Sequence, residues 1–194
     1  MNFIHISQNT LDNKTCKNFI SEFENHPWLQ ISGQTGNSDG LGDNNSKIKQ
    51  STDIGIDQTF LNDEKFGPLI HKLIDFLNSE LEIYKKKFPD LDLISNWGLR
   101  EKFNLQRYYP GEGYFGWHCE HNPLNPVLSS RVIAWTTYLN TVDDGGTEYR
   151  NFGTVDAVEG RCVFWPAYWT HFHRGIVSNT KTKYIATGWY NFME

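Results

Sequence analysis

The sequence has no apolar run long enough to cross a membrane and no recognisable secretory leader at its start. Its first ten residues, MNFIHISQNT, contain neither a cluster of positive charge nor a continuous apolar stretch. Cysteine is also scarce: Cys16, Cys119 and Cys162 are odd in number and far apart, which is atypical of a disulfide framework. These absences predict a cytoplasmic protein with reduced thiols and no membrane segment.

Positive charge is in the minority in this chain. It has 18 Lys and Arg against 23 Asp and Glu, a formal net charge of −5, and it contains no dense basic run. Because nucleic-acid surfaces are usually basic, this balance argues against a nucleic-acid partner. The 194 residues, 38% of them hydrophobic, suit one domain with a full core, and an aromatic fraction of 15% is typical of β-rich cores and aromatic-lined pockets.

The first 97 residues read as helical support around a polar loop. Asp12 can cap a helix that Pro27 ends, and Pro68 suits the first turn of a longer helix whose apolar face runs from Phe66 to Tyr84. Residues 32–46 are mostly Gly, Ser, Asn and Asp, a composition that cannot pack a core. We expect this segment to be a mobile loop, and it is a candidate lid over a site.

Short β runs with turn signals between them follow Trp97. They cover roughly residues 99–109, 114–120, 131–140, 147–152, 161–165, 169–173 and 184–192. Regular short strands without intervening helices are typical of a sandwich, jelly roll or barrel. The sequence therefore predicts an α+β fold and one domain over residues 1–194, with helical support in 1–97 and a jelly-roll catalytic core in 98–194.

Two pairs of candidate metal ligands fall in the β region. His118 and Glu120 stand at positions i and i+2, which a strand presents on one face, and His171 and His173 repeat this spacing. Two imidazole nitrogens and one carboxylate oxygen form the facial arrangement of non-heme Fe(II) oxygenases. The spacing alone leaves open which of His171 and His173 would be the second histidine ligand.

Three stretches of the second half carry a family resemblance. These are RYYPGEGYFGWHCEH, RVIAWTTYLNTVDDGGTEY and GRCVFWPAYWTHFHRGIVSNTKTKYIATGW, which together span about residues 98 to 192. They resemble the prolyl 4-hydroxylase-like branch of the Fe(II)- and 2-oxoglutarate-dependent dioxygenases. The resemblance implies a double-stranded β-helix, another name for this jelly roll, and Fe(II), 2-oxoglutarate and O₂ as cofactor and cosubstrates.

The resemblance also implies roles for individual residues. Fe(II) would be bound by His118, Glu120 and His173, since the family's distal histidine precedes x-Gly and lies ten residues before an anchoring lysine. That lysine would be Lys183, which would bind the distal carboxylate of 2-oxoglutarate together with Tyr108 and Thr147. Arg131 and Trp189 match family positions near the substrate. Two departures are that Glu120 replaces the usual Asp and that the Gly-Gly-Thr turn before Thr147 is one residue short.

The expected activity is hydroxylation of an unactivated C–H bond, with oxidative decarboxylation of 2-oxoglutarate to succinate. A prolyl residue in a peptide, another amino acid and a small metabolite remain open as substrates, and the oligomeric state is open too. One alternative is a nucleic-acid dealkylating dioxygenase, although that class anchors 2-oxoglutarate with arginines rather than a lysine at this spacing. The other alternative is a non-catalytic jelly-roll binding module.

Overall fold

A computed structural model describes residues 2–35 and 44–193 of the chain. Its helices are α1 (Asn13–Asn25), α2 (Phe66–Lys87) and the short α3 (Pro126–Ser129), with 3₁₀ turns η1 (Pro27–Leu29), η2 (Gln58–Asn62), η3 (Pro89–Leu93) and η4 (Trp169–His171). Its strands are β1 (His5–Ile6), β2 (Ile31–Ser32), β3 (Thr52–Ile56), β4 (Trp97–Leu99), β5 (Phe103–Tyr108), β6 (Arg131–Tyr138), β7 (Val142–Tyr149), β8 (Gly153–Ala157), β9 (Cys162–Pro166), β10 (His173–Ile176) and β11 (Lys183–Phe192). No described helix is long and apolar enough to span a bilayer.

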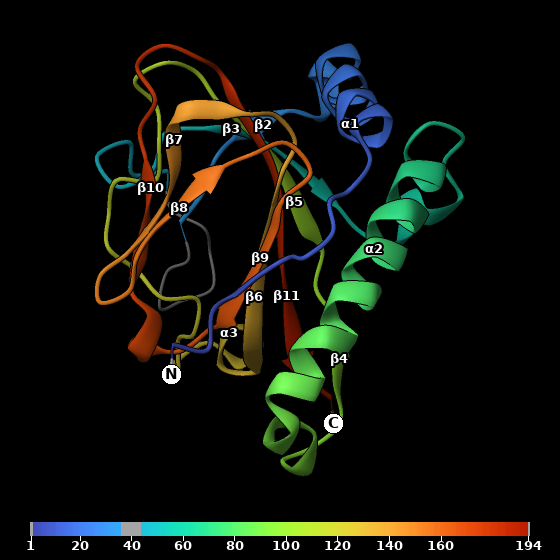
Figure 1. Ribbon diagram of the computed structural model, residues 1–194. Coiled ribbons are helices and arrows are strands. Elements are labelled where there is room, and N and C mark those ends of the chain that lie inside the picture. The colour runs from blue at the N-terminus through green and yellow to red at the C-terminus, as the bar shows by residue number, and fades with distance from the viewer. Residues whose placement is uncertain (1, 36–43, 194) are drawn as a thin grey trace.

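The strands form two antiparallel sheets that face each other. The major sheet has the order β1-β9-β6-β11-β5-β3-β2, with β4 paired to β11, and the minor sheet has the order β10-β7-β8. Helices α1 and α2 cover the outer face of the major sheet, and the minor sheet lies over its inner face (Figure 1). This arrangement is the predicted jelly roll with helical support, and the fold class is confirmed.

Strand β6 lies at the centre of this layered arrangement and is buried along its whole length. Ile133 and Trp135 pack into the core beneath the helices, whereas Ala134 and Tyr138 pack into the core between the two sheets. The alternation follows from the two-residue period of a strand. Both cores therefore meet on one strand, and the inner core is the one that borders the functional site.

The two predicted helices begin and end close to the expected residues. The Asp12 side chain caps α1 by accepting a hydrogen bond from the Thr15 backbone nitrogen at 2.9 Å. Helix α2 carries Pro68 in its first turn and three lysines in its last turn, where positive charge favours the helix dipole. Both helices bury their apolar faces against the major sheet, which fixes the rigid wall behind the site.

Several predicted strands differ from the observed elements. Residues 114–120 form no strand and make only isolated bridges at Tyr114 and His118, because this segment bonds to Lys49 and to β10 at separate points instead of forming a continuous ladder. Of the strand expected over residues 169–173, Trp169–His171 form the 3₁₀ turn η4, and β10 starts only at His173. The predicted turn near residue 144 lies inside β7, where a register shift between Val142 and Gly146 accommodates it.

The first 97 residues also contribute strands that the sequence pattern did not reveal. β3 pairs with β5, β2 pairs with β3, and β1 pairs with the edge of β9. Of the expected mobile loop, residues 36–43 lie outside the described residues, so the lid stays a prediction. At the start of the predicted loop, Ser32 belongs to β2, and the Gly33 backbone nitrogen donates to the Ser51 carbonyl at 2.9 Å.

A buried carboxylate ties the N-terminal segment to helix α2. Glu80 has no exposed surface, and its oxygens accept hydrogen bonds from His5 Nε2 at 3.0 Å, the Gln8 and Asn9 backbone nitrogens at 3.0 Å each, and Asn9 Nδ2 at 2.8 Å. Burial alone would raise the pKa of Glu80, but these hydrogen bonds outweigh it and lower the pKa below its usual value. The ionised carboxylate is therefore the form that the fold selects.

We expect Glu80→Gln to destabilise the protein at neutral pH by about 2–4 kcal/mol. The buried donors around this position would lose the negatively charged acceptor to which they bond. A carboxyl group whose pKa is lower in the folded state stabilises the fold at pH values above its unfolded pKa of about 4.3. This stabilisation is lost as the pH falls through the folded pKa. The difference in unfolding free energy between wild type and variant should therefore shrink below about pH 4. Urea unfolding across pH measures this, with the exposed Glu82→Gln as control; a difference that is independent of pH would contradict the role of the charge.

Candidate active site

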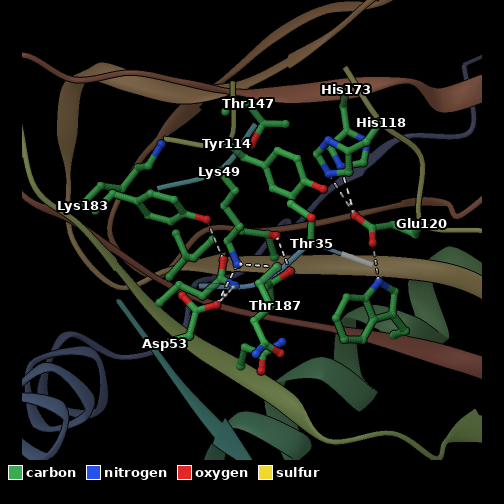
Figure 2. Close-up of a pocket in the computed structure, with 18 of the residues that line it drawn as sticks. Thr35, Lys49, Asp53, Tyr114, His118, Glu120, Thr147, His173, Lys183 and Thr187 are labelled. Carbon is green, nitrogen blue, oxygen red and sulfur yellow. Dashed lines mark hydrogen bonds and ion pairs between the residues drawn. The ribbon is translucent and has the colours of Figure 1, made fainter. Parts of the chain in front are cut away.

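A cavity of about 350 Å³ lies between the two sheets and is lined in part by residues 113–120, the crossing segment, which bonds to residues 48–50 on one side and to β10 on the other. The residues predicted for the site all line it: His118, Glu120, His173, Lys183, Tyr108, Thr147, Arg131 and Trp189. The structure thus brings together side chains from β5, β6, β7, β10, β11 and the crossing segment. Figure 2 shows the two histidines and Glu120 at one side of this cavity and Lys183 at the other.

Backbone pairing brings the two histidines of the cavity together. His118 and His173 exchange backbone hydrogen bonds of 3.0 and 2.9 Å, so the two residues lie directly opposite each other and their side chains start side by side. The Glu120 backbone nitrogen donates to the Ala167 carbonyl at 2.9 Å, which turns the carboxylate toward the same point. One nitrogen from each histidine and one Glu120 oxygen then lie within 4.8 Å of one another.

The hydrogen-bond partners of both histidines determine which ring nitrogen faces the cavity. Nδ1 of His118 lies 3.0 Å from the Gly116 carbonyl, and Nδ1 of His173 lies 2.9 Å from the His171 carbonyl. A carbonyl only accepts, so each Nδ1 carries the hydrogen and each Nε2 of the neutral ring presents a lone pair. The Nε2 atoms of His118 and His173 lie 3.5 and 3.2 Å from Glu120 Oε1.

The charge state of the cluster favours a cation at its centre. Burial is the main cause that lowers the pKa of His173 and keeps its ring neutral. Glu120 accepts from two donors at its second oxygen, which favours its ionised form. Two nitrogen lone pairs and one carboxylate converging on a point fit a divalent metal with open positions, as in the 2-His-1-carboxylate oxygenases.

The second oxygen of Glu120 has its own partners. Trp189 Nε1 donates to Glu120 Oε2 at 2.9 Å, and Arg131 Nη1 lies 3.5 Å from the same oxygen. The Arg131 guanidinium stacks on the Trp189 ring at 3.5 Å and bonds bidentately to Glu101. Arg131 and Trp189, which the sequence places near the substrate, therefore also contact the carboxylate itself.

His171 lies outside the cluster. It is buried, it faces away from the cavity, and its two ring nitrogens lie 2.8 Å from Thr170 Oγ1 and from the Asn2 carbonyl. Its ring stacks on Phe152 at 5.0 Å. Of the two histidines that the spacing left open, His173 is the one whose ring nitrogen lies beside Glu120, at 3.2 Å.

The opposite end of the cavity holds a buried cation. Lys183 is 4% exposed, and its Nζ donates to the Ile176 carbonyl at 2.9 Å and lies 5.1 Å from the centre of the Tyr108 ring. No carboxylate forms a salt bridge with it among the described residues. Burial lowers the pKa of Lys183 to about 8, against a smaller opposite effect of Asp144. An anion entering the cavity would supply the missing charge partner.

Tyr108 and Thr147, expected beside Lys183, are both engaged with other side chains. Tyr108 donates its hydroxyl to Gln106 Oε1 at 2.7 Å, and Thr147 Oγ1 lies 2.7 Å from the Tyr138 hydroxyl. Thr147 follows Gly146, whose φ of +139° is a conformation that an L side chain rarely adopts. The short turn before Thr147 still directs this residue into the cavity.

Sequence reasoning missed a second polar cluster on the cavity wall. Lys49, Ser51, Asp53 and Gln106 are buried there and bonded to one another. The alternation of Ser51, Asp53 and Gly55 with Thr52, Ile54 and Ile56 is a two-residue period that could have revealed strand β3 and its inward polar face.

Comparison with known proteins agrees with this site. Residues 103–191 match the model of the 2OG-Fe(II) oxygenase superfamily. No curated protein matches the chain in sequence. The match covers a little under half of the chain, and it supports the predicted Fe(II)- and 2-oxoglutarate-dependent dioxygenase class and its cofactors.

Solved structures of prolyl hydroxylases share the fold. A prolyl-4-hydroxylase of Pseudomonas putida is 14% identical with a TM-score of 0.70, covering 100% of this chain and 95% of that one. A viral collagen prolyl hydroxylase of Paramecium Bursaria Chlorella virus-1 is 15% identical with a TM-score of 0.69, covering 99% and 97%. A Trichoplax adhaerens prolyl hydroxylase, solved with a hypoxia inducible factor peptide fragment, is 15% identical with a TM-score of 0.72, covering 99% and 84%. The likeness to these structures is one of fold, and it agrees with the predicted resemblance to the prolyl 4-hydroxylase-like branch.

We expect His118→Ala and His173→Ala each to abolish tight Fe(II) binding, because two remaining ligands cannot hold the ion in this cavity. Glu120→Asp should retain part of the affinity, since the ligand type is kept, and Glu120→Ala should lose most of it. Titration of Fe(II) without oxygen measures the affinity. His171→Ala is the matched control and should still bind iron; loss of iron in this variant with retention in His173→Ala would reverse the assignment.

Proposed function

We propose that this dioxygenase binds Fe(II) through His118, Glu120 and His173 and binds 2-oxoglutarate through Lys183, and that it hydroxylates a C–H bond of an amino acid or prolyl residue. The observation that carries the proposal is that a cluster of lone pairs needing a cation and a buried cation needing an anion line one cavity. When bound, Fe(II) and 2-oxoglutarate supply the oxidising chemistry, in which 2-oxoglutarate and O₂ give succinate, carbon dioxide and a hydroxylated product.

Lys183 is proposed to anchor the distal carboxylate of 2-oxoglutarate. A charge-assisted hydrogen bond in a cavity that excludes most water is strong and directional. Thr147 and Tyr138 line the same end and have hydroxyls that can turn toward a carboxylate, because either atom of their pair can donate. Tyr108, whose hydroxyl is donated to Gln106, contributes its ring beneath the Lys183 ammonium.

Trp189 and Arg131 are proposed to orient Glu120 as well as to face the substrate. Their bonds to Oε2 leave Oε1 directed at the two histidine nitrogens. A glutamate has one more rotatable bond than the aspartate usual in the family, so fixing its second oxygen restores the lost rigidity.

The substrate class is supported by the fold and by the type of anchor. The prolyl hydroxylases of the same fold act on proline, as their names state, and one was solved with a peptide. The cation at the far end of the cavity is a lysine ten residues beyond the distal histidine rather than an arginine pair, which favours a hydroxylase over a nucleic-acid dealkylating enzyme. A small-molecule or peptide substrate is therefore proposed.

The experiment for this function is an iron- and 2-oxoglutarate-dependent turnover assay. Succinate is measured with and without Fe(II), and candidate peptides and free amino acids are examined for an added oxygen atom by mass spectrometry. We expect succinate only when iron is present. Succinate formation that is independent of iron, or none in any mixture with iron bound, would contradict the proposal.

Lys183→Ala should raise the 2-oxoglutarate requirement by at least ~10²-fold, since breaking a buried charge pair costs about 3–5 kcal/mol. In wild type the lysine must be protonated to bind the carboxylate, so 2-oxoglutarate affinity should fall above about pH 8, by up to about tenfold per pH unit. The Lys183→Arg variant should bind 2-oxoglutarate less tightly than wild type does, but its affinity should not fall above about pH 8, because arginine stays protonated. Exposed Lys181→Ala is the control; an equal effect at Lys181 and Lys183, or at neither, would place the anchor elsewhere.

Trp189→Phe should weaken Fe(II) binding by about 10- to 100-fold, the usual cost of removing a partner that orients a metal ligand. The indole N–H to Glu120 is lost while most of the ring surface is kept. Anaerobic iron titration gives the affinity, with the exposed Trp169→Phe as matched control. Unchanged iron affinity in Trp189→Phe would restrict this residue to the substrate.

A further inference from the structure

The cavity contains a second buried lysine that neither the metal cluster nor the 2-oxoglutarate end uses. Lys49 is 5% exposed, it comes from the N-terminal half of the chain, and it lines the same cavity. Its backbone bridges to Tyr114, while Gln50 and Ile48 bond to the Gly113 and Phe115 backbones at 2.9 and 2.7 Å. These pairings fix the Lys49 segment against the crossing segment that carries His118.

Asp53 holds the Lys49 side chain in place. The Lys49 Nζ to Asp53 Oδ2 distance is 2.7 Å, Gln106 Nε2 donates to the same oxygen at 2.9 Å, and Ser51 donates to Oδ1 at 2.7 Å. Three donors thus orient the carboxylate of Asp53. A buried ion pair is weak evidence for stability, because apolar residues of the same size stabilise as well or better. A pair placed on a cavity wall therefore calls for an explanation in binding.

The ammonium of Lys49 keeps hydrogen-bonding capacity for a ligand. Of its three hydrogens, one is directed to Asp53 and one, at 3.4 Å, to the Gln34 carbonyl. Within residues 2–35 and 44–193 no third acceptor is bonded to it. Figure 2 shows the Lys49 side chain between Lys183 on one side and the His118 and Glu120 cluster on the other.

The position of Lys49 relative to the metal cluster suits a substrate group. Its Nζ lies 6.0 Å from the centre of the Tyr114 ring, and the His118 ring stacks on the same Tyr114 ring at 3.6 Å. Lys49 and a candidate metal ligand therefore share one aromatic neighbour. A small molecule whose anionic end binds Lys49 would place its carbon atoms beside the cluster.

We propose that Lys49, positioned by Asp53, binds the carboxylate of a small amino-acid substrate. This inference rests on the proposed function and narrows its substrate to a free carboxylic acid. The cavity of about 350 Å³ is at the small end of the range for ligand sites, roughly 300–1,000 Å³, and it must hold 2-oxoglutarate as well. The Lys49 ammonium keeps a hydrogen beside its pair with Asp53, and a carboxylate oxygen accepts a stronger, charge-assisted hydrogen bond from it than a peptide carbonyl would.

The test measures binding of free amino acids to protein loaded with Fe(II) and 2-oxoglutarate without oxygen. Each of the twenty amino acids is titrated by calorimetry beside its carboxamide, and a proline-containing peptide is titrated in parallel. We expect at least one free acid to bind and its carboxamide to bind about 10- to 100-fold more weakly, the effect of losing a charge-assisted hydrogen bond. Binding of the peptide alone, of no free acid, or of acid and carboxamide equally would overturn the proposal.

Variants of the pair identify the residue responsible. Lys49→Met should weaken binding of the acid about 10- to 100-fold, and the exposed Lys47→Met in the same segment should bind as wild type does. Because Lys49→Met leaves Asp53 unpaired and can impair folding, Lys49→Met combined with Asp53→Asn removes both charges and should show the same loss. Wild-type affinity in a folded variant would overturn the role of Lys49. Titration of 2-oxoglutarate in the same samples separates this outcome from failure of the proposed function, in which 2-oxoglutarate itself would not bind.

Discussion

Two backbone carbonyls decide the chemistry of this cavity. Those of Gly116 and His171 each accept the Nδ1 hydrogen of the histidine two residues later, so both Nε2 lone pairs face Glu120. Such local bonds between a side chain and the backbone compete with regular strand structure. This explains why both histidines follow irregular segments, and it makes a bound cation the simplest way to satisfy two lone pairs and a carboxylate at one point.

Elements with a clear local sequence signal could be predicted, whereas residues whose role depends on contacts made in the folded chain could not. The helices were predictable from Asp12, Pro27 and the apolar face of α2, because caps and periodicity are local. The resemblance could select His173 over His171, since it spans many residues. The strand expected over residues 114–120 was wrong because the pattern of alternation there reflects ligand placement, not a ladder. The alternation of β3 could have revealed Asp53, but the place of Lys49 in the cavity depends on pairing with the segment around Tyr114, which lies far along the chain.

The two lysines of the cavity differ in how their charge is compensated. Lys183 relies on a carbonyl and an aromatic ring, so its environment penalises the ammonium and its pKa is lowered. Lys49 has a carboxylate at 2.7 Å that is itself fixed by Ser51 and Gln106. The Tyr108 hydroxyl, through Gln106, connects the surroundings of one lysine to those of the other. The hydrogen bonds from Tyr108 to Gln106 and from Gln106 to Asp53 therefore link the ring beside Lys183 to the carboxylate that holds Lys49.

Strand β11 sets the spacing along the cavity. Lys183, Ile185, Thr187 and Trp189 all line it, as alternate residues on one face of the strand should, and pairing to β6 stays in register until the irregularity between Tyr190 and Asn191. Lys183 and Trp189 are thus six residues, roughly 20 Å, apart on a rigid element. A single-residue insertion or deletion between them would turn one of the two side chains to the opposite face of the sheet. This stretch should therefore tolerate no change of length, because the number of residues between Lys183 and Trp189 keeps both side chains on the face that lines the cavity.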